Sequence, residues 1–275
     1  LQPYFTEYVN ALVSSGSVSA DGSLRFSVRE RGAPQVTWKG RASVADLSQA
    51  FGVSEVTIRA DLQMLAEQGL LVRTHGGAIA AGRLSPELSL ALRRQQQPLA
   101  KDHIGEAGAA LIQDGDAVYL DTSSTALAIA RHLTSQRHVT VITNSIAIVQ
   151  ELGDHPHLTV VMPGGRLRRE TASLIGVDGL DYVRRLNIQK GFFGAHGITP
   201  DEGLTDVSVE EAEVKQVVVG LCRQVVAVLD ATKWGRAGVA SFASLDQIDA
   251  IITDQSAPPG LVAQGQAAGV DVLLV

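Results

Sequence analysis

Cysteine is nearly absent from this chain, which contains only Cys222. One thiol cannot form an internal disulfide or a thiolate metal cluster, and this favours a reducing cytoplasm over an oxidising compartment. Long hydrophobic runs are also missing, because stretches such as "VVAVL" at 225–229 are far shorter than the roughly 20 residues that span a bilayer. No secretory signal is visible either. The sequence therefore predicts a cytoplasmic protein with no membrane partner.

Several catalytic signatures are lacking as well. The chain has no G-x-x-x-x-G-K-S/T phosphate loop, no G-x-G-x-x-G dinucleotide motif and no G-x-S-x-G nucleophile elbow. Its seven histidines are scattered, and the only close pair, His155 and His157, flanks Pro156 in a predicted surface loop. We expect no catalytic residue, no metal site and no cofactor.

Charge is distributed unevenly along the 275 residues. The formal net charge is -6, yet residues 1–101 carry a net +3 and residues 102–275 a net -9. A mildly basic front is thus attached to an acidic body, and the whole-chain charge says little about the partner of the front. A chain of this length is expected to form two domains.

Residues 43–52 have the pattern of a short amphipathic helix. Ser43 and Asp46 form an S-x-x-D capping pattern, and the apolar residues from Val44 to Phe51 follow at three- and four-residue spacing before Gly52. The pattern predicts one helix that ends at a glycine turn.

A second helix is predicted to begin after Ser54, which can cap it. Ile58, Leu62 and Leu65 form its inward stripe, and it ends near Gly69. Two short helices around a tight glycine turn are typical of a helix-turn-helix. Such pairs are also common as plain hydrophobic core, and the pattern alone leaves that alternative open.

Side chains that project away from the stripe are candidates for DNA contact, since a major groove admits one helix. After Gly69, "LLVRTHGGAI" contains two extended runs around a turn, as in a wing. Phosphate contacts would position the domain and base contacts would give it specificity. The predicted DNA-binding residues are Arg41, Ser54, Glu55, Val56, Thr57, Arg59, Gln63, Arg73 and His75.

Residues 43–78 resemble the N-terminal domain of the DeoR family of bacterial transcriptional repressors. The order V-S-x-x-T-I-R-x-D-L, followed by G-L-L-x-R-x-H-G-G, carries this resemblance. It implies a winged helix-turn-helix that binds double-stranded DNA. Ala60 stands where the family usually has a second basic residue, so we expect one contact to be absent and the affinity to be lower.

Residues 1–40 depart from the family, which has an amphipathic helix before the helix-turn-helix. Here the segment contains Gly32 and Pro34, and its apolar residues from Leu24 to Val28 alternate with period two. Either "YFTEYVNALV" supplies the missing helix from a distance, or this start is atypical and poorly ordered. Leu1 in place of methionine also suggests an incomplete or unusual start.

The body alternates helical patterns with short runs rich in β-branched residues. Strands are predicted near 117–120, 139–143, 158–162, 191–194, 225–229, 250–253 and 270–275. This alternation predicts a mostly parallel sheet covered on both faces. The fold class is therefore α/β, with a winged helix-turn-helix in front of a mostly parallel-sheet domain.

Polar residues or glycines follow six of these strands. They are Asp121, Asn144, Gly164 with Gly165, Gly194, Asp230 and Asp254. Ligands of open α/β sheets bind beyond the carboxyl ends of the strands, so we expect these positions to converge. A single polar residue there is ordinarily a turn former or a helix cap, an alternative that stays open for about half of them.

The loop "LDTSSTALAIARHL" at 120–133 has the sharpest signal. Ser123, Ser124 and Thr125 stand where a strand gives way to a helix, which would aim hydroxyls and free backbone N–H groups at one anion. An ordinary Ser/Thr cap explains the motif equally well. "VITNSIAIV" repeats the arrangement with Asn144 and Ser145.

Acidic and basic residues near 208–236 suit a polyol phosphate, because carboxylates accept from hydroxyls and lysine binds phosphate. Glu211 and Lys215 come from "DVSVEEAEVK", and Asp230, Lys233 and Arg236 from "LDATKWGR". The alternative is a solvated helix surface with ordinary i, i+4 pairs.

The successive motifs "LDTSSTALA", "VITNS", "PGGRLRRETASLIG", "GFFGAHGITPDEGLT", "EEAEVK" and "VLDATKWGR" resemble the DeoR family sensor domain from about residue 85 to Asp254. That domain is related to ribose-phosphate isomerases and binds phosphorylated sugars or related metabolites. The resemblance implies effector contacts from Asp121, Ser123, Ser124, Thr125, Asn144, Arg168, Lys215, Asp230 and Lys233, and the local patterns add Ser145 and Glu211. Ser123 replaces a usual glycine and Ala126 a usual threonine, which puts the affinity for phosphate or the identity of the ligand in question.

An isomerase-like enzyme is the alternative function. Sugar-phosphate isomerisation needs a carboxylate base, and Lys215 falls where the related isomerases carry it, although Glu210 and Glu211 are close in sequence. A shared fold does not decide this. We expect a sensor rather than an enzyme.

The expected organisation is an atypical segment at 1–40, a winged helix-turn-helix at 41–79, a linker and coupling helix at 80–100 and a ribose-phosphate-isomerase-like α/β sensor domain at 101–275. The expected function is repression of a sugar or carbohydrate operon, controlled by a phosphorylated sugar. Operators are generally bound by dimers, so we expect a homo-oligomer, a dimer or a tetramer.

Overall fold

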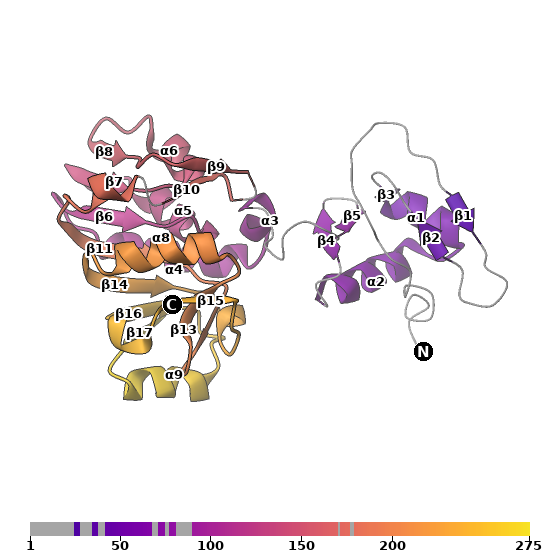
Figure 1. Ribbon diagram of the computed structural model, residues 1–275. Helices are drawn as coiled ribbons and strands as arrows, with labels where there is room; N and C mark the ends of the chain where they lie inside the picture. Colours follow the sequence, from indigo (N-terminus) through magenta and orange to yellow (C-terminus); the bar gives the residue numbers. More distant parts are fainter. Residues whose placement is uncertain are drawn as a thin grey trace. The chain divides into compact units, whose positions relative to one another are not determined.

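The computed structural model describes residues 25–27, 35–37, 42–67, 71–74, 77–80, 90–169, 171–176 and 179–275. The chain forms two compact units, Leu1–Pro86 and Glu87–Val275 (Figure 1).

The first unit contains α1 (Val44–Phe51), α2 (Glu55–Glu67) and a three-stranded antiparallel sheet. The sheet has the order β3 (Ala42–Ser43), β5 (Gly77–Ala80), β4 (Leu71–Thr74), so β4 and β5 form the predicted wing hairpin. A second hairpin joins β1 (Arg25–Ser27) to β2 (Gln35–Thr37), in line with the period-two alternation of that stretch.

The turn between α1 and α2 follows from its residues. Gly52 has φ +65°, a conformation that costs glycine little, and Ser48 Oγ donates to Val53 O at 2.6 Å. Ser54 caps α2, because its Oγ accepts from Thr57 N at 3.1 Å. Ile58 and Leu62 are buried with Val44 in a small core, which confirms the predicted inward face at these positions.

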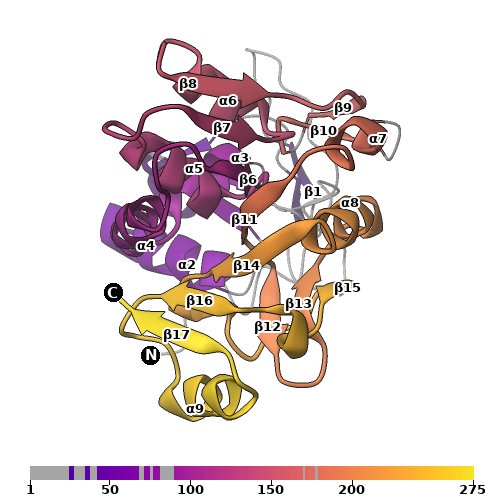
Figure 2. The same cartoon turned by 90° about the vertical axis from the view of Figure 1, so that its left-hand side faces the viewer.

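The second unit is built on a seven-stranded sheet (Figure 2). Its strands are β6 (Ala117–Leu120), β7 (Val139–Ile142), β8 (Leu158–Val161), β11 (Ile188–Phe193), β14 (Cys222–Val228), β16 (Ala250–Thr253) and β17 (Asp271–Leu274). All neighbouring pairs are parallel, in the order β17-β16-β14-β11-β6-β7-β8. All seven predicted strands and the α/β class are confirmed.

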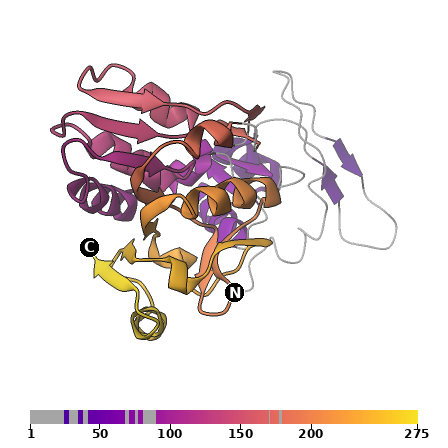
Figure 3. The ribbon, with the colours of Figure 1, turned by 60° about the vertical axis from the view of Figure 1, so that its left-hand side comes forward.

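Helices lie on both faces of this sheet (Figure 3), and a hydrophobic cluster packs on each face. Val118 and Leu120 point to the cluster that contains α4 (Pro98–Ala110), α5 (Ser124–His132) and α6 (Ile146–Leu152), whereas Tyr119 points to the other. The helices α7 (Leu180–Val183), α8 (Val209–Val219) and α9 (Pro259–Ala267) belong to that second cluster. The alternation along β6 thus confirms the predicted burial of both faces.

Some elements go beyond those predicted from the sequence. A hairpin pairs β9 (Arg166–Arg168) with β10 (Ser173–Ile175), and a small antiparallel sheet joins β12 (Gly197–Thr199), β13 (Gly203–Asp206) and β15 (Ala240–Ala243). The 3-10 turns η1 (Ala231–Lys233) and η2 (Leu245–Gln247) follow β14 and β15. The short helix α3 (Leu90–Gln95), which precedes α4, lies within the helix predicted at 80–100.

The order of the large sheet reverses between β6 and β11. From β6 the chain adds β7 and β8 on one side, while β11, β14, β16 and β17 extend the other side. In open α/β sheets ligands bind beyond the carboxyl ends of the strands at such a reversal. The loops after Leu120 and Phe193 are therefore where a ligand is expected.

Candidate functional site

The outward side of α2 presents polar side chains to solvent. Val56 is 72% exposed, Ser54, Glu55, Arg59 and Gln63 are also exposed, and Thr57 is half-buried. The hydroxyls of Ser54 and Thr57 lie 2.9 Å apart. The first turns of α2 thus leave the predicted base-contacting residues accessible.

Arg59 pairs with Glu55 one turn earlier, at 2.6 Å between Nη2 and Oε2. The two side chains are 53% and 46% exposed, and ion pairs of this kind contribute little to stability. A phosphate or a base edge can therefore replace Glu55 as the partner of Arg59 at small cost. Arg73 lies in β4, opposite Ala78, and Arg41 and His75 lie outside the described residues.

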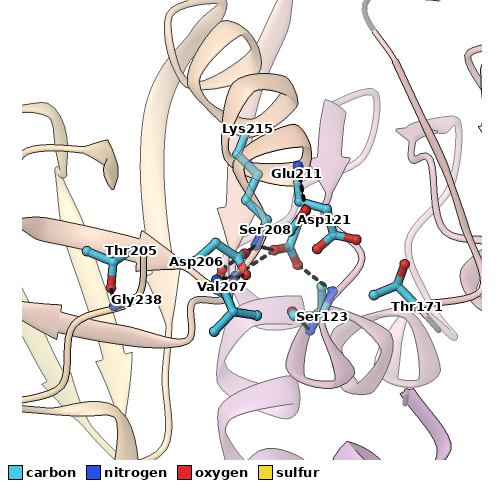
Figure 4. Close-up of polar contacts among 12 residues, drawn as sticks. Asp121, Ser123, Thr171, Thr205, Asp206, Val207, Ser208, Glu211, Lys215 and Gly238 are labelled. Atoms are coloured by element: carbon cyan, nitrogen blue, oxygen red, sulfur yellow. Dashed lines mark hydrogen bonds and ion pairs between the residues drawn. The ribbon is translucent and has the colours of Figure 1, made fainter. Parts of the chain in front are cut away.

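Lys215 of α8 is the centre of a buried charge network in the second unit (Figure 4). Its Nζ lies 2.9 Å from Asp121 Oδ2 and 2.8 Å from Asp206 Oδ2, and it donates to Gly194 O at 2.8 Å. The ammonium also lies 4.9 Å from the centroid of the Phe242 ring. The structure thus joins the ends of β6, β11 and β13 through one cation.

Asp121 ties the two loops at the sheet reversal together. Its Oδ1 accepts from Ser123 N and its Oδ2 from Gly194 N, both at 2.9 Å. A Cβ on Gly194 would lie 2.4 Å from Ser123 Cβ, so the close approach of the loops requires glycine there. The side chain of Asp121 is fully buried, and its position is fixed by these bonds.

Two members of the network, Lys215 and Asp206, are held in the ionised form. Burial by itself would lower the pKa of Lys215, but the carboxylates of Asp121, Asp206 and Glu211 raise it well above its usual range. Burial would raise the pKa of Asp206, yet the Lys215 ammonium and the backbone N–H of Val207 leave it below the ordinary value. Lys215 and Asp206 are therefore charged at neutral pH.

The loop at 123–125 shows one of the two roles that its sequence left open, the helix cap. Ser123 Oγ accepts from Ala126 N at 3.0 Å, so this hydroxyl is the N-cap of α5. Ser124 and Thr125 are buried, and their hydroxyls make no hydrogen bond within the described part of the chain. Their part in effector binding remains a prediction, whereas Ser123 has a structural role.

Asn144 and Ser145 lie after β7. Asn144 Oδ1 accepts from the hydroxyl of Tyr119 at 2.8 Å, and its Nδ2 donates to Leu174 O at 2.8 Å. Burial, with the charge of Asp121, raises the pKa of Tyr119, which stays protonated as a donor. Ser145 Oγ caps α6 by accepting from Ile148 N at 3.4 Å.

Arg168 reaches Glu211 from the β9–β10 hairpin. Arg168 Nη1 lies 3.4 Å from Glu211 Oε1, and both side chains are largely buried. Glu211 also belongs to the first turn of α8, where its backbone N–H donates to Ser208 Oγ at 3.3 Å. The charge of Glu211 raises the pKa of Lys215, so Glu211 lies beside the Lys215 network. Arg168 joins the same network through its ion pair with Glu211.

Asp230 and Lys233 belong to a second group of charges. Asp230 caps η1 by accepting from Thr232 N at 3.0 Å. Lys101 of α4 is buried and lies close enough to both residues for their charges to affect its pKa, which burial lowers to about 8. Arg93 of α3 contributes positive charge to the same place. Cations from α3, α4 and η1 therefore gather beside Asp230.

Three of these residues, Asp206, Lys101 and Arg93, were not among the predicted contacts. The "GIT" and "GLT" runs on either side of "PDE" carried a hairpin signal that places Asp206 at a strand end. Lys101 falls at helical spacing with buried Ile104 and Gly108. A lysine on the apolar face of a predicted helix was thus the sequence signal that could have identified Lys101 as buried.

Two hollows of the second unit are lined by residues other than the predicted effector contacts. The cavity lined by Ile198, Trp234, Leu245 and Leu261 has about 10 Å³, room for a single water at most. An open depression of about 430 Å³ is lined by Thr134, Ser135, Arg137 and His157, all of which precede β7 or β8, whereas Asp121 follows β6. Among the described residues no three histidines, cysteines or carboxylates are grouped as a metal site, and no helix is long and apolar enough to cross a membrane.

Comparison with protein families identifies both units. The DeoR C-terminal sensor domain matches residues 96–255, and the DeoR-like helix-turn-helix domain matches residues 35–83. Together these matches cover most of the described chain.

Curated relatives agree with these matches over most of the chain. YgbI of Escherichia coli, an uncharacterised HTH-type transcriptional regulator, is 35% identical over 223 residues, which are 81% of this chain and 87% of YgbI. The glycerol-3-phosphate regulon repressor of Escherichia coli is 31% identical over 82% of this chain and 88% of its own length. Among solved structures, ribose 5-phosphate isomerase A of Methanocaldococcus jannaschii has a TM-score of 0.37 and 18% identity over 49% of this chain and 53% of that chain, too low to bear on function.

Proposed function

The chain belongs to the DeoR family of DNA-binding transcriptional regulators, and we propose that it represses an operon of sugar or carbohydrate metabolism. A phosphorylated sugar or a related metabolite controls its hold on DNA. The buried network of Asp121, Lys215 and Asp206 at the sheet reversal is the observation that carries this proposal. The relative named as the glycerol-3-phosphate regulon repressor of Escherichia coli supports the same class of effector.

The DNA contacts proposed are those on the exposed side of α2 and on the wing. Thr57 and Arg59 would contact base edges, and Arg41, Arg73 and His75 would contact phosphates. The exposure of the α2 side chains and the weak Arg59–Glu55 pair support this assignment. The net +3 of residues 1–101 gives the basic charge that the acidic body lacks.

The effector site would use two kinds of groups. Buried carboxylates accept hydrogen bonds from sugar hydroxyls, and the cations Lys101 and Lys233 attract the phosphate. The N-terminus of α5, with the unbonded hydroxyls of Ser124 and Thr125, adds positive potential on the same edge of the sheet. Asn144 and Arg168 would complete the contacts.

The site is proposed to sense its ligand rather than to transform it. A general base needs a carboxylate that is free to take a proton. Asp121 and Asp206 are held by Lys215, Glu211 faces Arg168, and Glu210 pairs with Arg166 at 2.7 Å. Each nearby carboxylate is thus occupied by a cation, which disfavours the isomerase alternative.

The regulator is proposed to act as a homo-oligomer, a dimer or a tetramer, in the cytoplasm, where bacterial DNA lies. A two-fold dimer would match operator half-sites about one helical turn apart, some 34 Å. Light scattering after gel filtration distinguishes these states from a monomer.

Fluorescence anisotropy with labelled duplex from the region upstream of its own gene tests the proposal. The titration is done at about 50 mM and about 200 mM salt, with glycerol 3-phosphate, ribose 5-phosphate, glucose 6-phosphate and fructose 6-phosphate as probes. We expect weaker binding at the higher salt and a change of roughly 5-fold or more with one sugar phosphate. Turnover of one probe with no effect of any probe on DNA binding would favour the enzyme instead.

A further inference from the structure

Arg93 is a half-buried arginine, and two of its three guanidinium nitrogens have no hydrogen-bond partner among the described residues. Its Nε and Nη2 are shielded from solvent and make no hydrogen bond among the described residues. Arg94, the next residue of α3, is exposed. Two adjacent arginines on one short helix thus lie in opposite environments.

The surroundings of Arg93 are cationic and belong to the effector edge of the sheet. Lys101 Nζ donates to the carbonyl oxygens of Arg93 and Gln96, at 2.6 and 2.7 Å, which ties α3 to α4. The helix α3 also contacts α5, the helix that begins after Ser123. Asp206 and Lys233 lie near enough for the Arg93 charge to lower the pKa of each.

Guanidinium N–H groups that are shielded from water without a hydrogen-bond acceptor are unfavourable, because they lose water and gain no bond in return. Such groups call for an acceptor from outside the protein chain, such as a water, an ion or a ligand. The guanidinium fork matches the oxygens of a phosphate or carboxylate in a bidentate arrangement, which a lysine cannot reproduce. With Lys101 and Lys233 nearby, an incoming anion would relieve repulsion among three cations.

We propose that Arg93 binds the anionic group of the effector, so that the effector joins α3 to α4 and η1. The proposal rests on the proposed function and assigns a contact and a route of regulation to it. The helix α3 is the first described element after β5 along the chain. An effector bound to Arg93 would therefore hold α3 in place. This helix is the part of the sensor unit that continues, along the chain, into the segment leading to the wing.

The test compares Arg93→Gln with Arg94→Gln in the full-length chain. Both variants remove one positive charge from α3, so general electrostatics change equally. Thermal unfolding is followed with increasing inorganic phosphate and with glycerol 3-phosphate, because a ligand that binds the folded state raises the midpoint. We expect the anion dissociation constant to rise about 10- to 100-fold for Arg93→Gln and to stay near the wild-type value for Arg94→Gln.

Without anion, Arg93→Gln is expected to unfold near the wild-type midpoint, since it removes the repulsion by Lys101 and Lys233 together with the attraction to Asp206. If it unfolds earlier, Arg93→Met, which keeps the apolar stem, decides the question. Anion binding at wild-type strength in whichever variant is folded would overturn the proposal.

A second readout separates this inference from the proposed function. Saturating effector should alter DNA affinity in wild type and Arg94→Gln, and this change should be lost in Arg93→Gln at the same concentration. A wild-type chain indifferent to every anion would overturn the proposed function and this inference together. A wild-type response that Arg93→Gln reproduces in full would overturn this inference alone.

Discussion

The two units use positive charge in opposite ways. Arg59 of the DNA-binding unit is more than half exposed and pairs with a similarly exposed glutamate, whereas the Lys215 side chain of the sensor unit is 6% exposed and lies between two carboxylates. An exposed, weakly paired arginine can exchange its partner for a long polyanion at little cost. A buried, fully engaged lysine instead fixes the positions of the two carboxylates beside it. If the proposed DNA contacts are correct, the comparison explains how an acidic chain binds DNA, because the charges proposed for DNA are the accessible ones.

Replacing Lys215 with methionine should give the largest effect. The variant leaves Asp121 and Asp206 buried without their cation, so we expect the sensor unit to lose about 3–5 kcal/mol of unfolding free energy. Urea denaturation measures the loss. Lys190→Met, which breaks the less buried Lys190–Asp116 pair of 2.6 Å at the other end of the sheet, is the control and should cost less. Equal losses of unfolding free energy in the two variants would contradict a larger contribution of the Lys215 network to stability.

The two units should also respond separately to core truncation. Ile58 is fully buried in the small core of the DNA-binding unit, and Ile104 is fully buried in the sensor unit. Each change to alanine should cost about 2–5 kcal/mol in its own unit. Ile58→Ala should abolish DNA binding and leave effector binding intact, and Ile104→Ala should lower the midpoint of the sensor transition. Loss of effector binding in Ile58→Ala would contradict this independence.

The buried Lys101 should make the stability of the sensor unit vary with pH in the alkaline range. Burial lowers the pKa of Lys101 from 10.5 to about 8; Asp230 opposes this shift, and Lys233 and Arg93 add to it. Because the folded pKa lies below the unfolded one, the unfolded chain binds more protons between these values. The free energy of unfolding should therefore rise from about pH 8 to about pH 10.5, by roughly 3 kcal/mol at most, and be flat below. Urea denaturation of wild type and Lys101→Met at several pH values checks this. Unfolding free energies that change with pH in the same way in both proteins would refute it.

The smallest effect on stability is expected at Arg59, whose replacement should weaken DNA binding instead. Arg59→Ala should change the unfolding free energy by less than about 0.5 kcal/mol and cost about 1–3 kcal/mol of DNA-binding free energy. Glu55→Gln removes the competing partner and should keep or raise the affinity. Anisotropy and thermal melts measure both quantities. Unchanged DNA binding in Arg59→Ala would place the contact elsewhere.

Local patterns predicted what depends on neighbours in sequence. The β-rich runs from 117 to 275 all form strands, and the spacing of Ile58 and Leu62 gives the buried face of α2. The turn at Gly52 and the cap at Ser54 also follow from their own residues. Periodicity and capping chemistry act within a few residues, so a single sequence contains them.

The sensor site depended on contacts that no local pattern contains. Asp121 meets Asp206 through a lysine on α8, and Ser123 Cβ closes against Gly194 across the sheet reversal. Asp206 is positioned by a hairpin that was not predicted, and Arg93 by a helix of six residues. Residue type indicated charge chemistry near 208–236, but only tertiary packing determines which charges meet.

Parallel titrations of one sample test the central claim most directly. The effector chosen from the sugar-phosphate panel is titrated into the free protein by calorimetry and into the protein–DNA complex by anisotropy. Because coupling between two sites is reciprocal, DNA must change effector affinity by the same factor as effector changes DNA affinity. We predict equal factors, each roughly 5-fold or larger. Saturation of the sensor unit with no change in DNA affinity would contradict the account.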